Sequence, residues 1–187
     1  MMTAPNSTGW IRRLDATGIP LLLARLGVGG MFAYLAYMKL RDPINFLKLT
    51  HEYGVVPPDQ PIVLNLIAVG LPWLELVCAA ALLLGVGRRG AALLVTGMLL
   101  FFTPMLFLRA WGLHTAVGSA FATFCAVKFD CGCGTGEVFI CPKLVENVAL
   151  LSGALIALFS RSQRFCLANL FTRRRATASV EPLPQRA

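Results

Sequence analysis

Three cysteines gather in one short, glycine-rich stretch of the chain. The segment FDCGCGTGEVFICPKLVEN, residues 129–147, places Cys131, Cys133 and Cys141 within eleven residues, directly before an apolar run. The interleaved glycines let the backbone turn tightly there. Thiols held this close together favour disulfide chemistry when they face an oxidising compartment.

The bonds that these three thiols could form differ in strain. A Cys131–Cys133 bond would close a very small ring, so it would be strained and easily reduced. A bond from either residue to Cys141 would be more relaxed. The pattern therefore predicts a redox relay in which Cys131 and Cys133 carry the exchange and Cys141 resolves it, and these three residues are the catalytic candidates.

Two other interpretations of the same residues stay open. One pair could be a permanent structural disulfide, with the third thiol inert. A metal site would need a fourth ligand, since structural zinc takes four, and His114, Asp130 or Glu137 could supply it. The cysteine spacing matches no standard zinc or iron–sulfur pattern, so no metal ligand is assigned.

The other cysteines and the histidines carry weaker indications. Cys78 and Cys125 fall in apolar runs and Cys166 follows the last of them, so all three are predicted to be packing or lipid-facing thiols. His51 and His114 have no companion at ligand spacing and are predicted to be surface or interfacial residues.

The composition indicates which elements position these residues. Of the 187 residues, 57% are hydrophobic and 14% are charged, whereas a soluble domain carries roughly 25% charged residues. A helix that spans a bilayer needs ~20 mostly apolar residues. The chain is therefore predicted to be an all-α membrane protein, a bundle of four transmembrane helices with a cysteine-containing periplasmic loop and no second folded domain.

The predicted boundaries follow the apolar runs. The four spans are expected at about 19–38, 62–85, 91–108 and 144–159 of a bundle that covers residues 19–160. Residues 1–18 and 161–187 would form terminal tails. Segment 109–143 begins with an apolar stretch that is short for a span, so it is predicted to be interfacial or re-entrant before the last helix.

The distribution of basic residues predicts the orientation. With four spans, one side carries ten Lys or Arg and the other six, and a fifth span would move the most basic tail to the opposite side. We therefore expect both termini in the cytoplasm of a bacterium, in its inner membrane, and the cysteine loop in the periplasm. The net charge of +8 is then an anchor on anionic lipid and not a nucleic-acid surface.

Charged residues inside the predicted spans are costly and usually have a partner or a functional role. Arg25 and Glu75 lie at depths of roughly 9 and 15 Å from the same face, so an intramembrane charge pair is predicted, either to hold the helices in register or to form a quinone or proton site. Lys143, Glu146 and Asn147 share one face of the fourth helix beside the cysteines and are predicted to orient the loop.

The runs LLARLGVGGMFAYLAYMKLRDP and LPWLELVCAAALLLGVGRRGAAL resemble the DoxX family and its relative MauE, small four-helix membrane proteins of bacteria. The residues that carry this resemblance are Arg25, Gly29, Lys39, Pro72, Glu75 and Gly85. The DCGCG stretch followed by LVEN is similar to the MauE branch, in which a Cys-Gly-Cys element precedes the last span. Two departures, Gly134-Thr135-Gly136 in place of an aromatic residue and the additional Cys141, leave the substrate and the partner open.

The resemblance implies redox work in the membrane, because DoxX-like subunits are associated with thiosulfate and quinone oxidoreduction and MauE with maturation of a disulfide-rich periplasmic dehydrogenase. The leading hypothesis is a thiol–disulfide redox protein that exchanges electrons with quinone or a periplasmic thioredoxin-like partner. The alternative is a noncatalytic accessory subunit of a larger respiratory or photosynthetic membrane complex. Transport is disfavoured because four short spans offer little to line a pathway.

Overall fold

The structure is a computed structural model that describes residues 17–54, 56–57, 59–117 and 123–160. The predicted terminal tails lie outside these residues, except for residues 17–18 of the first. Cys166 also lies outside the described part of the chain.

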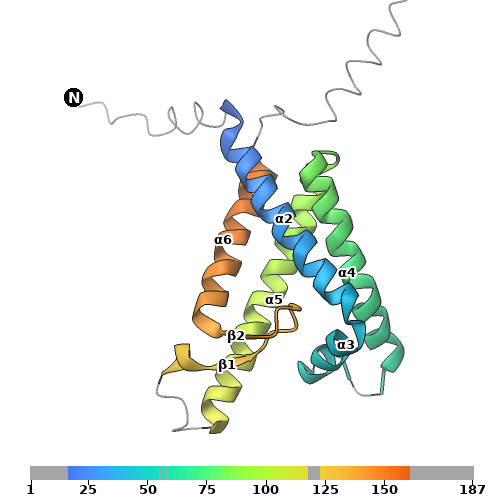
Figure 1. Ribbon diagram of the computed structural model, residues 1–187, viewed down its shortest axis with the longest axis vertical. Helices are drawn as coiled ribbons and strands as arrows, with labels where there is room; N and C mark the ends of the chain where they lie inside the picture. Colours follow the sequence, from blue (N-terminus) through green and yellow to red (C-terminus); the bar gives the residue numbers. More distant parts are fainter. Residues whose placement is uncertain (1–16, 55, 58, 118–122, 161–187) are drawn as a thin grey trace, which may run out of the picture.

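Four long helices dominate the described residues (Figure 1). They are α2 (Ile19–Arg41), α4 (Pro61–Leu84), α5 (Arg88–Val117) and α6 (Ile140–Phe159). Each is long and apolar enough to cross a membrane, and within the described residues they are the four helices that meet this description. The predicted all-α fold with four transmembrane helices is therefore confirmed.

The four helices pack through small residues at close approaches. Helix α2 lies against α4 and α6, and α5 lies against α6. A Cβ atom added to Gly29 of α2 would lie 2.9 Å from the Leu83 side chain of α4, and one added to Gly153 of α6 would lie 2.7 Å from Val28. Helix association in lipid depends on van der Waals packing and interhelical hydrogen bonds, and small residues at an interface favour both by allowing a close approach.

Arg25 joins α2 to the end of α4. The side chain is 2% exposed, and its guanidinium donates hydrogen bonds to the carbonyl oxygens of Leu82 at 2.7 Å and Leu83 at 2.8 Å. These carbonyls belong to the last turn of α4, where the regular helix bonds end; the Leu82 carbonyl also accepts from the Gly85 N–H at 3.2 Å. The predicted Arg25–Glu75 pair is therefore wrong: Arg25 caps α4, and the ion-pair partner of Glu75 is Lys39.

Shorter elements cluster at the opposite end of the bundle. Helix α3 (Pro43–Glu52) follows α2 directly. A 3₁₀ turn η2 (Phe124–Ala126) leads into β1 (Lys128–Asp130), which pairs antiparallel with β2 (Glu137–Phe139) so that Phe129 faces Val138. The hairpin loop between these strands carries Cys131 and Cys133.

The segment before the last helix differs from its prediction. Helix α5 continues to Val117 and passes Pro104 without interruption, so the first part of segment 109–143 extends a transmembrane helix. A proline inside a membrane helix is tolerated because neighbouring groups satisfy the freed carbonyl. The rest, as far as it is described, forms η2 and the hairpin, which lie between α5 and α6.

Candidate functional site

The hairpin loop is held against the end of α2 and against α3. Gly134 has a φ of +83°, and a Cβ atom there would lie 2.6 Å from Cβ of Met38 and 3.3 Å from the backbone nitrogen of Lys39. From the other side, the Tyr53 hydroxyl at the end of α3 donates a hydrogen bond to the Cys131 carbonyl at 3.0 Å. Only glycine fits both the backbone conformation and the space at position 134.

Cys131 and Cys133 are free thiols that interact with each other. The Cys133 backbone N–H donates to Sγ of Cys131 at 3.3 Å, and Sγ of Cys133 donates to the Cys131 carbonyl at 3.7 Å. The turn is closed by the Gly132 N–H, which donates to Oδ1 of Asp130 at 3.0 Å. Cys131 is 7% exposed, so it is shielded from bulk water on most sides.

This arrangement differentiates the two thiols. Hydrogen bonding from the Cys133 side chain to the Cys131 thiol lowers the pKa of Cys131 to about 7. The positive charge of Lys143 also lowers this pKa, whereas burial raises it. Because Cys133 donates the proton in this interaction, its own pKa is raised well above the usual range, and burial raises it further. Of the two thiols, Cys131 is therefore the one that ionises at the lower pH.

Cys141 is not a third free thiol. It forms a disulfide with Cys125, with the two Cα atoms 5.1 Å apart. The prediction that Cys125 is a packing thiol and Cys141 a free resolving thiol is therefore wrong. The 3₁₀ turn η2 folds back onto the start of α6, and this return over sixteen residues could not be read from the sequence pattern.

A buried ion pair lies close to the thiols. Nζ of Lys39 on α2 is 2.6 Å from Oε1 of Glu75 on α4, and both side chains are nearly inaccessible to solvent. The Lys39 ammonium also lies 5.2 Å from the centre of the Phe46 ring. Lys39 is near enough to the loop that its charge lowers the pKa of Cys133, although the effects of Cys131 and of burial outweigh it.

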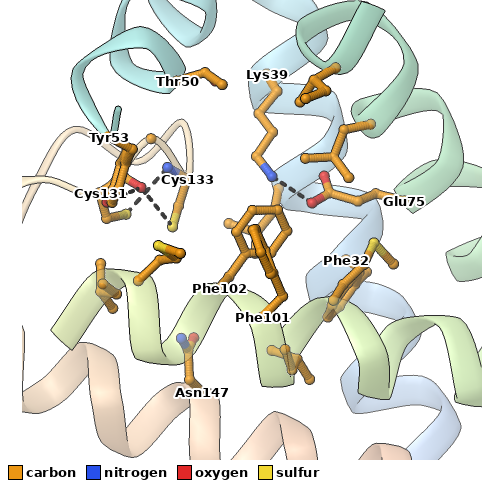
Figure 2. A pocket seen from close by; sticks show the side chains of 18 of the residues that line it. Phe32, Lys39, Thr50, Tyr53, Glu75, Phe101, Phe102, Cys131, Cys133 and Asn147 are labelled. Carbon is orange, nitrogen blue, oxygen red and sulfur yellow. Dashed lines mark hydrogen bonds and ion pairs between the residues drawn. The ribbon is translucent and has the colours of Figure 1, made fainter. Parts of the chain in front are cut away.

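A cavity of about 540 Å³ connects these groups (Figure 2). Its lining includes both free thiols of the loop and both members of the Lys39–Glu75 pair. Most of the remaining wall is apolar and comes from α2, α4 and α5, including Phe32, Phe101 and Phe102. A volume of this size is typical of a site for a small organic molecule.

The predicted loop-orienting residues are divided between two contacts. Lys143 pairs with Glu146 at 2.7 Å, and Nδ2 of Asn147 donates to Oγ1 of Thr103 on α5 at 3.2 Å. Lys143 and Asn147 also line the cavity. Within the described residues, no three His, Cys, Asp or Glu side chains are grouped in a way that could hold a metal ion.

Residues 17–160 match the family model described as methylamine utilisation protein MauE. The chain belongs to the MauE family. No curated protein and no solved structure matches it. The predicted resemblance to MauE is thus confirmed, whereas the resemblance to DoxX stays a prediction.

In this MauE-family chain, the residues that carried the resemblance meet at the α2–α4 interface. Arg25 approaches Gly85 so closely that a Cβ atom there would lie 2.6 Å from the guanidinium, and Gly85 also has a positive φ of +72°. Lys39 pairs with Glu75. The sequence therefore identified these residues but paired Glu75 with Arg25, whereas its partner is Lys39.

Proposed function

We propose that this protein is a membrane thiol–disulfide redox protein whose reactive pair is Cys131 and Cys133. The observation that carries the proposal is the mutual interaction of the two thiols, which favours a thiolate on Cys131 and a proton on Cys133. A thiolate that forms near neutral pH is both abundant and nucleophilic enough for exchange.

The exchange reaction follows from this asymmetry. The Cys131 thiolate attacks a disulfide, forms a mixed disulfide and releases one thiolate of the oxidised molecule. The negative charge on Cys131 then disappears, and with it the main cause of the raised pKa of Cys133. Cys133 loses its proton, attacks Sγ of Cys131 and releases the second thiolate, so that the loop ends as a Cys131–Cys133 disulfide.

The Cys125–Cys141 disulfide provides a second stage. Cys125 is exposed, whereas Cys131 is buried, so a water-soluble protein can reach the former more readily. Both cysteine pairs contribute to one cluster of side chains with Val127, Phe129 and Ile140. In this scheme the small-ring Cys131–Cys133 disulfide oxidises Cys125 and Cys141, whose disulfide in turn oxidises a partner's thiols.

In this proposal quinone on the membrane side accepts the electrons, and a thioredoxin-like protein on the aqueous side donates them. The loop would face the periplasm of a bacterium, and both termini would face the cytoplasm, as the ten-to-six distribution of basic residues favours. The name of the family adds methylamine utilisation as the process in which such an exchange would take part.

A redox titration tests the proposal. The purified full chain is equilibrated in glutathione buffers of graded poise, free thiols are alkylated, and each cysteine is assigned by mass spectrometry. We expect Cys131 and Cys133 to convert together between dithiol and disulfide within the glutathione range, because strained bonds are the more reducible ones. Cys125–Cys141 should require a more reducing buffer.

Cys78 provides the internal control for this titration. It is a buried thiol of α4, and Cys78→Ala should leave the midpoint of the Cys131–Cys133 conversion unchanged. Cys133→Ser should remove the conversion and leave a mixed disulfide with glutathione on Cys131. Persistence of both loop thiols in the reduced form at every poise would exclude the proposed exchange.

A further inference from the structure

The cavity has an apolar entrance on the lipid-facing side of the bundle. Three of its lining residues on α5 are also strongly exposed on the outer surface: Leu93 is 60% exposed, Leu94 48% and Phe101 48%. In a bilayer these side chains contact acyl chains and not water. A molecule dissolved in lipid can therefore enter between α4 and α5 without crossing an aqueous phase.

The inner end of the same cavity is polar and chemically reactive. The Lys39–Glu75 pair lies there, and among the described residues Oε2 of Glu75 is buried without a hydrogen-bond partner. Buried polar atoms are normally satisfied, so an unsatisfied carboxylate oxygen points to a missing partner. Cys131 and Cys133 also line this cavity; in Figure 2 the two cysteines lie to the left of the Phe101 and Phe102 rings, and the Lys39–Glu75 pair lies above the rings.

We propose that this cavity binds the ring of a lipid-soluble quinone, which is the electron acceptor of the Cys131–Cys133 pair. This inference rests on the proposed thiol chemistry and assigns the place in the fold where its membrane acceptor binds. The isoprenoid tail would leave between α4 and α5, past Leu93 and Leu94, and the ring would lie among the aromatic side chains. A quinone carbonyl accepts a hydrogen bond from the Lys39 ammonium.

The reaction balances with the groups that the cavity contains. Cys131 as the thiolate and Cys133 as the thiol together lose two electrons and one proton and form one sulfur–sulfur bond. The quinone gains these two electrons, the Cys133 proton and a second proton from the Lys39 ammonium, which regains a proton from water, and it becomes a quinol with one O–H at each former carbonyl. Oε2 of Glu75 can accept a hydrogen bond from a quinol hydroxyl, which gives this oxygen the partner that it otherwise lacks.

Two other occupants explain less of the cavity. A lipid acyl chain matches the apolar wall but leaves the ion pair and both thiols without a role. The side chain of a protein partner on the aqueous side would have to pass the loop that Gly134 and Tyr53 hold closed. A quinone uses the lipid-facing entrance, the apolar wall and the polar end together.

Gly97 offers a direct way to fill the cavity. It lines the cavity from α5, and a Cβ atom added there would contact nothing within 4 Å. Gly97→Leu therefore adds apolar volume where the quinone would lie, and replacing a helix glycine favours the helix itself. Gly70→Leu is the matched control, because Gly70 of α4 is equally open but is not part of the lining.

The experiment uses the reduced full chain in lipid nanodiscs with decylubiquinone under anaerobic conditions. Wild type and Gly70→Leu should reduce one quinone for each Cys131–Cys133 disulfide formed, read from quinone absorbance and from mass spectrometry. Gly97→Leu should be slower by about tenfold or more, a change equivalent to ~1.4 kcal/mol or more. Its glutathione titration should equal that of wild type.

The two proposals fail in different ways in this experiment. If wild type exchanges with glutathione but does not reduce the quinone, the quinone site is excluded and thiol exchange is retained. Equal quinone rates in Gly97→Leu and Gly70→Leu would likewise exclude the cavity as the site. Thiols that react with neither glutathione nor quinone would exclude both proposals.

Discussion

Helix α2 buries one cation near each end, and the two cations have different kinds of partner on α4. Arg25 is 2% exposed and Lys39 is 7% exposed, and both contact α4. Arg25 donates to two backbone carbonyls of the last turn of α4. Lys39 instead pairs with a carboxylate that has a second, unsatisfied oxygen and borders a cavity.

The difference separates a structural role from a chemical one. The carbonyls that Arg25 satisfies are permanent features of a helix end, and Arg25 lies against Gly85 and is not among the residues that line the cavity. At the Lys39 end of α2, a cavity, the unsatisfied oxygen of Glu75 and two thiols occur together. Burial of a charge alone therefore does not identify a functional site; an adjacent cavity with unsatisfied groups does.

The first prediction concerns removal of Arg25. Arg25→Ala takes the guanidinium donor from the Leu83 carbonyl and leaves the Leu82 carbonyl with the Gly85 N–H alone, at ~1–3 kcal/mol for a buried group that loses its partner. We expect a large decrease in folded yield and in the midpoint of thermal unfolding in detergent. Arg89→Ala is the control, because Arg89 is an exposed residue at the same end of the bundle. This variant should unfold at a higher temperature than Arg25→Ala, and equal midpoints would contradict the prediction.

The second prediction compares how strongly Lys39 and Arg25 are each coupled to Glu75 in stability. Lys39→Met and Glu75→Leu each strand a buried charge, at about 3–5 kcal/mol, whereas the double variant strands none. The double variant should therefore be more stable than the sum of the single effects predicts, by more than ~1 kcal/mol. Arg25→Ala and Glu75→Leu should be additive in the same unfolding assay.

This double-mutant cycle also has a functional measurement. A folded Lys39→Met/Glu75→Leu chain should still exchange thiols with glutathione but should lose quinone reduction. A strong coupling of Arg25 with Glu75 would contradict the distinction between the two ends of α2.

The helices could be predicted from the sequence because long apolar runs determine them locally. The predicted start of the first span at residue 19 coincides with the start of α2, and the second span differs from α4 by one residue at each end. The end of α5 could not be predicted in the same way. The apolar stretch after residue 109 is short for a separate span and is therefore predicted to be interfacial, but it continues α5, which packs against α6 and η2.

The residues of the site could be predicted from the sequence, but the side chains with which they pair could not. Cys131, Cys133 and Glu75 were identified because thiols in a glycine-rich loop and charges in apolar runs are unusual. Their partners depend on side-chain direction and on chain reversal. Lys39 ends an apolar run, and nothing in that run indicates that α3 folds back over it. Cys125 lies too far along the chain from Cys141 to suggest a bond.

The smallest expected effect concerns the charge beside Cys131. Its pKa is lowered to about 7 by the hydrogen bond from Cys133 and, to a lesser extent, by Lys143, while Asp130 opposes them. Tyr53 contacts the same residue through its hydroxyl. A thiolate reacts and a thiol does not, so alkylation of Cys131 should be nearly constant above pH 7 and should fall about tenfold per pH unit below it.

Lys143→Gln removes the positive charge and should move this midpoint upward, toward the ordinary value of 9. Arg25→Lys, at the far end of α2, should leave the midpoint where it is. The rate is measured with iodoacetamide on the reduced chain from pH 5 to 10, with Cys131 identified by mass spectrometry. A wild-type midpoint near 9, or equal midpoints in wild type and Lys143→Gln, would show that the charges at the cavity end of the bundle do not act on the thiol.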